Sequence, residues 1–300
     1  MPKRKNFDSI LTSGQTYKKQ FTEEEKEAWV ETQKQNRETA NGIVENALPE
    51  ISQNSEKLLQ YLDTQTRFFS YSVRNAILIM QQRPDAVKLG DSSYWRKKGF
   101  YIQRREKNKP VLIVEPANAF VRDDGSVGQY YNAKEVYDIT QTTARLDKSK
   151  PVKYEETELL TALISGRKCD IEVLDEMADG VNAEYIPDDN CILVRSGMGA
   201  EDIFRALSKE MAHCEFSRLY DDYSYESFDF HAKCVSYMTS KRYGIESSVP
   251  TLPESYKELD NGELLEELTA IREAANSIGG RTARTLELNR QEKSRENETR

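Results

Sequence analysis

The sequence is poor in the residues that build disulfide frameworks and zinc sites, with four cysteines and two histidines in 300 residues. The cysteines stand far apart along the chain, and no Cys-x-x-Cys pair is present. This pattern excludes a secreted disulfide scaffold and a zinc knuckle, and it predicts four reduced thiols.

Long hydrophobic runs are also missing. No stretch approaches the roughly 18 consecutive apolar residues of a membrane helix, and the basic N-terminus is not followed by the apolar run of a signal peptide. We therefore expect no membrane partner and a cytoplasmic location. Hydrophobic residues still make up 37% of the chain, which is enough for folded cores, and the length predicts about two domains.

The chain as a whole does not have a positive net charge, since its net charge is −8. That balance argues against a protein devoted to nucleic acid, but the charge is unevenly distributed. Between Thr66 and Leu112 there are eleven basic and three acidic residues, a local charge of +8, so the other residues carry −16. The same segment contains seven aromatic residues: Phe68, Phe69, Tyr71, Tyr94, Trp95, Phe100 and Tyr101.

Cations interleaved with flat rings suit single-stranded nucleic acid, because Arg and Lys neutralise phosphates while unpaired bases stack on aromatic faces. Buried aromatic residues beneath a solvated basic surface would give the same pattern. Both interpretations of the basic segment are open at this level.

The local patterns predict an α+β protein. Residues 1–20 are polar and predict a mobile tail. Thr22 and Glu25 form a capping box at the start of a helix that runs towards Leu48, and further helices follow Pro49 and Ser72. Short β-type runs at 100–105, 111–121 and 130–140 predict an antiparallel sheet, and the polar, proline-containing segment 146–157 predicts a linker.

The second half predicts a smaller α+β domain over 158–250 and a C-terminal helix with a charged tail over 251–300. Its elements are expected as a helix at 158–165, strands at 171–174, 183–186 and 191–195, and helices at 200–218, 225–243 and 262–278. The last two strands predict a β-hairpin, and Gly244 is in the position of a helix C-cap. The last helix is expected to be an appendage that frays from Gly279 onward.

Several separated motifs between about residues 25 and 145 stand in a recognisable order. They are Tyr71-Ser72-x-x-Asn75, Gln82-x-Pro84, Trp95-x-x-x-Gly99, Glu115-Pro116 and Val136-Tyr137-Asp138-Ile139-x-Gln141-Thr142. Together they resemble the N-terminal domain of the ArdC antirestriction family. The resemblance implies a single-stranded DNA-binding domain over 21–145, carried by plasmids, integrative elements and phages, which shields incoming DNA from host defence. The glycine-rich turn of that family is replaced here by 106–110, which contains no glycine.

The basic segment and this resemblance together predict the residues that contact DNA. They are Arg67, Tyr71, Arg74, Asn75, Trp95, Arg96, Lys97, Lys98, Arg104, Arg105 and Lys107. Trp95 has the alternative of a place in the core. Single-stranded DNA is the expected partner, and duplex DNA and a host defence protein stay open as further partners.

The second half resembles the zincin-like peptidase domain that often follows this DNA-binding domain. Zincins use His-Glu-x-x-His, in which two histidines on one helical face bind zinc and the Glu activates a water. Here Lys209 replaces the first histidine, before Glu210 and His213, and Lys233 aligns with the third ligand. Because an ammonium cannot coordinate zinc, we predict no metal, no cofactor and no catalytic residue, with the lysines paired to Glu210 or Asp229.

Two other functions are compatible with the sequence. The domain could be an active zinc metallopeptidase, or the acidic remainder of the chain could mimic DNA and inhibit a host defence nuclease. A different metal site built from His213, Cys214, His231 and Cys234 has poor geometry, because adjacent residues diverge by about 100° on a helix. Packing is the simpler interpretation of those four residues.

Overall fold

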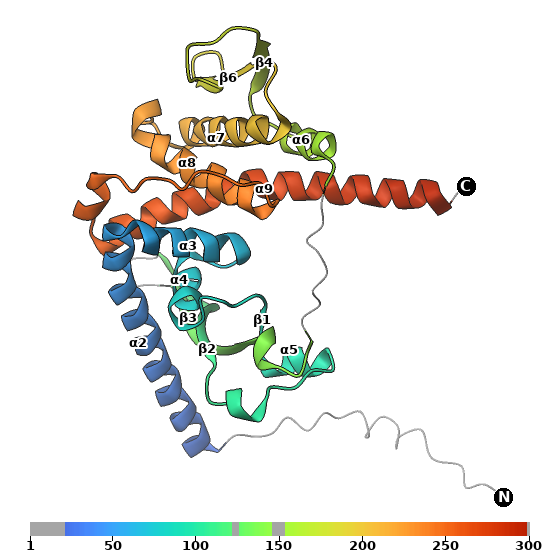
Figure 1. The fold of residues 1–300 in the computed structure, drawn as a ribbon. Coiled ribbons are helices and arrows are strands. Elements are labelled where there is room, and N and C mark those ends of the chain that lie inside the picture. Colours follow the sequence, from blue (N-terminus) through green and yellow to red (C-terminus); the bar gives the residue numbers. More distant parts are fainter. Residues whose placement is uncertain (1–21, 122–125, 146–153, 299–300) are drawn as a thin grey trace, which may run out of the picture.

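The computed structural model describes residues 22–121, 126–145 and 154–298, with the side chains of 118–121 and 293–298 left aside (Figure 1). It is an α+β protein, as the sequence predicts. The predicted tail at 1–20 and most of the predicted linker at 146–157 lie outside the described residues.

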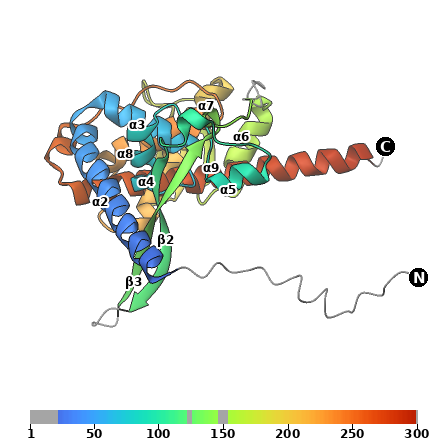
Figure 2. The same cartoon turned by 90° about the horizontal axis from the view of Figure 1, so that it is seen from below.

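The N-terminal half contains helices and a three-stranded antiparallel sheet of order β1-β3-β2. Strands β2 and β3 form a long hairpin, and α2 runs beside it (Figure 2). The elements are α2 (Glu23–Gln53), α3 (Ser55–Arg67), α4 (Val73–Gln82), β1 (Leu89–Gly90), α5 (Ser92–Lys97), η1 (Arg104–Glu106), β2 (Val111–Val121), β3 (Val127–Asp138) and η2 (Ile139–Gln141).

Two local predictions in this half are wrong. Helix α2 does not end near Leu48 but continues through Pro49, because Leu48 and Ile51 are buried and their burial offsets the cost of a proline inside a helix. The expected strand at 100–105 is a loop and the short helix η1, with a single bridge between Ile102 and Thr142.

The second half contains a three-stranded sheet of order β4-β6-β5, covered by helices. Strands β5 and β6 form the predicted hairpin, and β4 is parallel to β6. Gly244 ends α8 with a φ of 76°, a conformation that favours glycine. The elements are α6 (Glu156–Ile164), β4 (Asp170–Leu174), β5 (Ala183–Ile186), β6 (Cys191–Arg195), α7 (Ala200–Leu219), α8 (Tyr225–Arg242), η3 (Glu254–Glu258) and α9 (Asn261–Glu298).

Helix α9 lies between the two halves and contacts both of them (Figure 1). Arg272 Nε donates to the carbonyl of Tyr71 at 2.6 Å, and Arg281 Nη1 donates to Glu215 Oε1 at 2.6 Å. The prediction that the last helix is an appendage and frays from Gly279 onward is therefore wrong. Thr282 and Leu286 are buried, and the helix continues to Glu298.

The hydrophobic core runs across the predicted domain boundary. Buried side chains of α2, α3 and α4 belong to the same cluster as those of the second-half helices and of strands β5 and β6. A polar contact also crosses the boundary, since Tyr237 donates its hydroxyl to Asp63 Oδ1 at 2.6 Å. The segment 146–157 therefore divides the two sheets but not the main core.

We expect Ile271→Ala to lower the free energy of unfolding by about 2–5 kcal/mol, because it opens a cavity where α9 joins the core. Urea unfolding followed by circular dichroism measures this change. Leu288→Ala is the matched control, since Leu288 is exposed on the same helix. Equal stability losses in the two variants would contradict the central position of α9.

Candidate functional site

The segment 136–142 forms a scaffold beneath the basic segment. Trp95 Nε1 donates to the carbonyl of Tyr137 at 2.9 Å. Asp138 Oδ1 accepts hydrogen bonds from the amides of Val87 at 2.7 Å and Lys88 at 2.8 Å. Gln141 Nε2 donates to the carbonyl of Lys109 at 2.7 Å. The motif that resembles the ArdC family thus holds the middle and the end of the basic segment in place.

The Asp138 carboxylate keeps its charge within this scaffold. Its burial favours the neutral acid, but hydrogen bonds from Thr140 and from the backbone of Lys88 and Val87 outweigh that effect and lower the pKa of Asp138. A charged acceptor makes stronger hydrogen bonds than a neutral one. The loop before β1 is therefore firmly attached to the end of β3.

Two residues expected to contact DNA are buried instead. Trp95 is 2% exposed, and its indole is already hydrogen-bonded to Tyr137. Asn75 is 6% exposed, and its side-chain amide makes two 2.8 Å hydrogen bonds with the backbone of Val114. Neither side chain can reach a ligand at the surface, so both leave the predicted DNA-binding set.

Three further residues of that set contact other parts of the N-terminal half. The Arg67 guanidinium donates to the carbonyls of Ala86, at 2.9 Å, and Pro84, which fixes the loop after α4. Arg74 donates to Asn41 Oδ1 at 3.2 Å. Tyr71 is half-buried, and burial raises its pKa. The guanidinium groups of Arg67 and Arg74 are thus hydrogen-bonded within the fold, although Arg67 is exposed and Arg74 and Tyr71 are half-buried.

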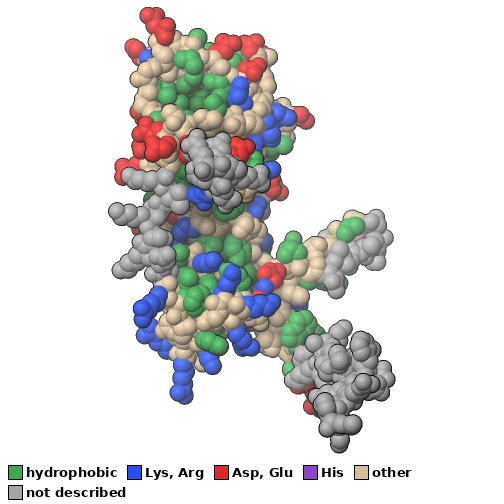
Figure 3. Space-filling view, turned by 90° about the vertical axis from the view of Figure 1, so that its right-hand side faces the viewer, with side chains coloured by type: hydrophobic (Ala, Val, Ile, Leu, Met, Phe, Trp, Pro, Cys, Tyr) green, Lys and Arg blue, Asp and Glu red, His purple; other side chains and the backbone are tan. Residues whose placement is uncertain are grey.

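The remaining six predicted residues are exposed: Arg96, Lys97, Lys98, Arg104, Arg105 and Lys107. We call these six the basic surface. The residues on α5 and those around η1 come to the same end of the molecule, because Trp95 and Gln103 bind neighbouring positions of the scaffold, Tyr137 and Gln141. Lys and Arg side chains gather at the lower end of the face in Figure 3.

Most of the basic surface has no partner of opposite charge. Arg105 contacts Glu106 at 3.7 Å. For the other five side chains, the described part of the chain contains no ion-pair partner within 4.0 Å. Lys109, in the same turn and also exposed, was not among the predicted contacts. Its position two residues after Lys107 could have predicted that Lys109 lies beside the basic surface.

The second candidate site lies between α7 and α8, in the segment that resembles a metallopeptidase motif. We call its five residues the remnant metal site: Lys209, Glu210, His213, Asp229 and Lys233. Lys209 Nζ lies 2.9 Å from Asp229 Oδ1 and 3.4 Å from Glu210 Oε1. Lys233 Nζ lies 2.6 Å from Asp229 Oδ2. The carboxylates are therefore neutralised by ammonium groups of the chain itself.

Glu210 is held in place by hydrogen bonds from Tyr185 and Tyr225. Its Oε2 accepts the amide of Tyr185, on the edge strand β5, at 2.9 Å, and both carboxylate oxygens accept the hydroxyl of Tyr225. Burial raises the pKa of Glu210, while the Lys209 charge acts in the opposite direction. Burial alone would lower the pKa of Lys209, but Glu210, Asp229 and Tyr225 raise it overall. The arrangement suits a structural ion pair.

His213 is fully buried and neutral. Its Nδ1 lies 3.1 Å from the Tyr223 hydroxyl, and its ring stacks on Tyr225 with the centroids 4.0 Å apart. Burial, and then the Lys209 charge, lower the pKa of His213 to about 3. Its Nε2 has no hydrogen-bond partner and lies 4.0 Å from Asp229 Oδ1.

These residues do not fit a divalent metal. His213 Nε2 and Asp229 Oδ1 could each bind one, but the Lys209 ammonium contacts Asp229 and repels a second cation. The alternative set with Cys214, His231 and Cys234 does not assemble, since His231 pairs with Glu267 on α9. Across residues 22–121, 126–145 and 154–298, no cluster of three or more His, Cys, Asp or Glu side chains is arranged for a metal.

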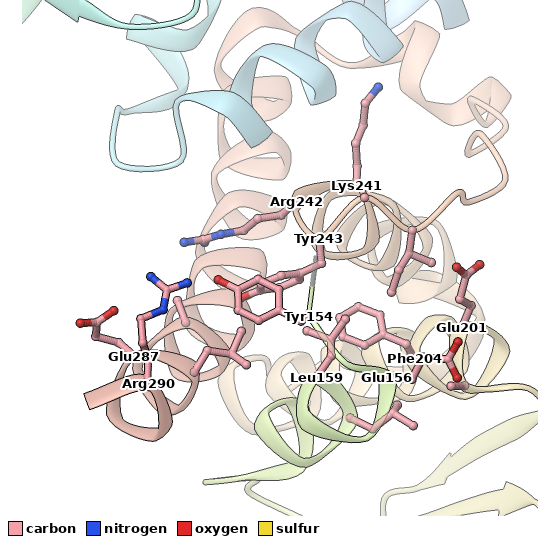
Figure 4. A pocket seen from close by; sticks show the side chains of 16 residues that line it. Tyr154, Glu156, Leu159, Glu201, Phe204, Lys241, Arg242, Tyr243, Glu287 and Arg290 are labelled. Atoms are coloured by element: carbon pink, nitrogen blue, oxygen red, sulfur yellow. The ribbon is translucent and has the colours of Figure 1, made fainter. Parts of the chain in front are cut away.

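Two clefts of similar volume in the second half bear on the candidate sites. One, of about 860 Å³, borders the remnant metal site. The other, of about 830 Å³, lies between α6, α8 and the later part of α9, with Tyr154, Phe204 and Tyr243 at its centre (Figure 4). The cations at the edge of this second cleft are engaged, because Lys241 pairs with Asp63 and Arg242 lies over the Phe69 ring. These two contacts join the second half to the N-terminal half at the edge of the cleft.

None of the helices in the described ranges has a stretch that is both long and apolar enough to span a membrane.

We expect the unmodified chain to retain no zinc after dialysis, whereas Lys209→His binds about one zinc ion through the new histidine, His213 and Asp229. Elemental analysis measures the zinc. Lys209→Gln removes the ammonium without adding a ligand and is the matched control. Stoichiometric zinc in the unmodified chain would contradict this account of the site.

We expect the stability of the fold to fall at acidic pH, because His213 stays neutral in the folded chain. The pKa falls from 6.5 to about 3 on folding, so between these values the unfolded chain binds a proton that the folded chain does not. Stability is therefore lost as the pH falls below about 6.5, by about 1.4 kcal/mol per pH unit from this group. Urea unfolding of the chain and of His213→Gln between pH 7 and pH 4.5 measures the difference, and equal pH dependence would contradict it.

No protein-family model and no curated protein matches the chain. The solved structures that are similar to it include the metal-free and the Mn(II)-bound crystal structures of the antirestriction protein ArdC from plasmid R388. The metal-free structure is 15% identical, with a TM-score of 0.49, and the match covers 71% of this chain and 86% of that one. The Mn(II)-bound structure is 15% identical, with a TM-score of 0.47, and the match covers 71% and 85%. Both are structures of the family that the sequence motifs resemble.

Proposed function

We propose that this chain is a DNA-binding antirestriction protein of a mobile genetic element, which binds chiefly single-stranded DNA and shields it from host defence. The basic surface carries this proposal. It presents six exposed cations on one rigid scaffold, and five of them have no ion-pair partner among the described residues. When such cations neutralise phosphates, counterions are released from the DNA. No salt bridge within the protein has to be broken first.

The distribution of charge gives the bound DNA an orientation. The face in Figure 3 has Lys and Arg at its lower end and Asp and Glu towards its upper end. DNA is attracted to the first end and repelled from the second, so it binds at the tip of the N-terminal half. The net charge of −8 is compatible with this arrangement, because the local charge governs short-range contacts.

The antirestriction role is inferred from the sequence motifs that resemble the ArdC family. The alternative of an acidic inhibitor that mimics DNA uses the opposite end of the molecule and does not use the basic surface. The two functions make opposite predictions for DNA, since a DNA mimic competes with nucleic acid and does not bind it.

The second half, in this proposal, has no peptidase activity. This part is supported by the ammonium of Lys209 beside Asp229 and by the hydrogen bonds that occupy both oxygens of Glu210. A general base must be free to accept a proton from water. The alternative of an active metallopeptidase requires a metal ion, which the zinc measurement above tests.

We expect the full chain to bind labelled single-stranded DNA with an affinity that falls as salt rises. If about five phosphates are neutralised, the slope of log K against log salt is about −3.5. Replacing Arg96, Lys97 and Lys98 together by Gln removes three contacts and should reduce the slope to about −1.4. Fluorescence anisotropy at several salt concentrations measures both slopes.

A matched triple replacement of Arg167, Arg218 and Arg284 by Gln is the control. These arginines are exposed in the second half, and the variant has the same net charge as the first one. Its slope should equal that of the unmodified chain. Equal slopes for all three proteins, or an affinity that salt does not change, would overturn the assignment of the basic surface.

A further inference from the structure

We propose that Tyr101 is a stacking platform for an unpaired nucleobase and that it gives the basic surface its preference for single-stranded over duplex DNA. This inference rests on the proposed DNA-binding function. Tyr101 is not among the residues predicted to contact DNA. The inference also names the group that the site recognises, which is an unpaired base.

The Tyr101 side chain is highly exposed to solvent. It is 62% exposed, more than any other aromatic side chain of the described residues. The neighbouring aromatic residues are used differently, since Trp95 is buried and Phe100 packs near it with ring centroids 6.4 Å apart. An exposed ring of this size keeps a large apolar area in water unless a ligand covers it.

The backbone beneath the ring is fixed. The amide of Tyr101 donates to Thr143 Oγ1 at 3.1 Å, and its carbonyl accepts the amide of Thr143 at 2.8 Å. The next residue, Ile102, forms a bridge with Thr142. Only the two side-chain torsions of the tyrosine remain free, so little conformational entropy is lost when a base covers the ring.

The position of Tyr101 suits a nucleotide that binds through both its base and its phosphates. Lys98 and Arg104, three residues to either side, are exposed members of the basic surface. A base can lie on the ring while the flanking phosphates contact these cations. In a duplex the faces of the bases are already stacked on one another, so only the cations can act.

The test uses the full chain and fluorescence anisotropy with three labelled probes: an oligothymidylate, the same length of abasic strand, and a duplex. We expect Tyr101→Ala to weaken oligothymidylate binding about 5- to 150-fold, the effect of losing one stacked base. Duplex and abasic-strand affinities should change less than about twofold, and the salt slope should stay the same because no charge is removed. Tyr101→Phe retains the ring and should bind as the unmodified chain does.

Tyr131→Ala is the control for removal of an exposed aromatic ring, since Tyr131 is 49% exposed on β3, outside the basic surface. Thermal unfolding of each variant checks that the fold is intact. If Tyr101→Ala binds oligothymidylate as tightly as the unmodified chain, with salt-dependent binding retained, the stacking platform is overturned and the proposed function stands. If the unmodified chain shows no salt-dependent binding to any probe, the proposed function fails, and the stacking platform with it.

Discussion

The structure depends on the burial of α9 between the two halves of the chain. This helix closes a core to which α2, α3 and α4 contribute together with α6, α7 and α8. Separation of the two halves would therefore expose buried side chains of the N-terminal helices to water. The second half therefore supports the half that presents the cations.

In the remnant metal site, the ammonium groups of two lysines neutralise two carboxylates. The Lys209 ammonium lies 2.9 Å from Asp229 Oδ1 and 3.4 Å from Glu210 Oε1, and it repels a second cation. Buried carboxylates without a counter-charge would destabilise the fold. The lysines supply that charge covalently, so the arrangement needs no ion from solution.

The sequence predicted the features that local chemistry determines. The capping box at Thr22 and the strands at 111–121, 183–186 and 191–195 are present as expected. The roles of Asn75 and Trp95 were not predictable, because their partners lie 39 and 42 residues away and the same side chains suit DNA contact or buried hydrogen bonds. The end of α9 was missed because its buried stripe is narrow among many charged residues.

Hydrogen exchange of the full chain, with and without single-stranded DNA, tests the central claim most directly, namely that DNA binds at the basic surface while the second half serves as support. The account predicts that DNA slows amide exchange over 96–109 and leaves α7 and α8 unchanged. Protection of α7 and α8 around Lys209, with none over 96–109, would contradict it.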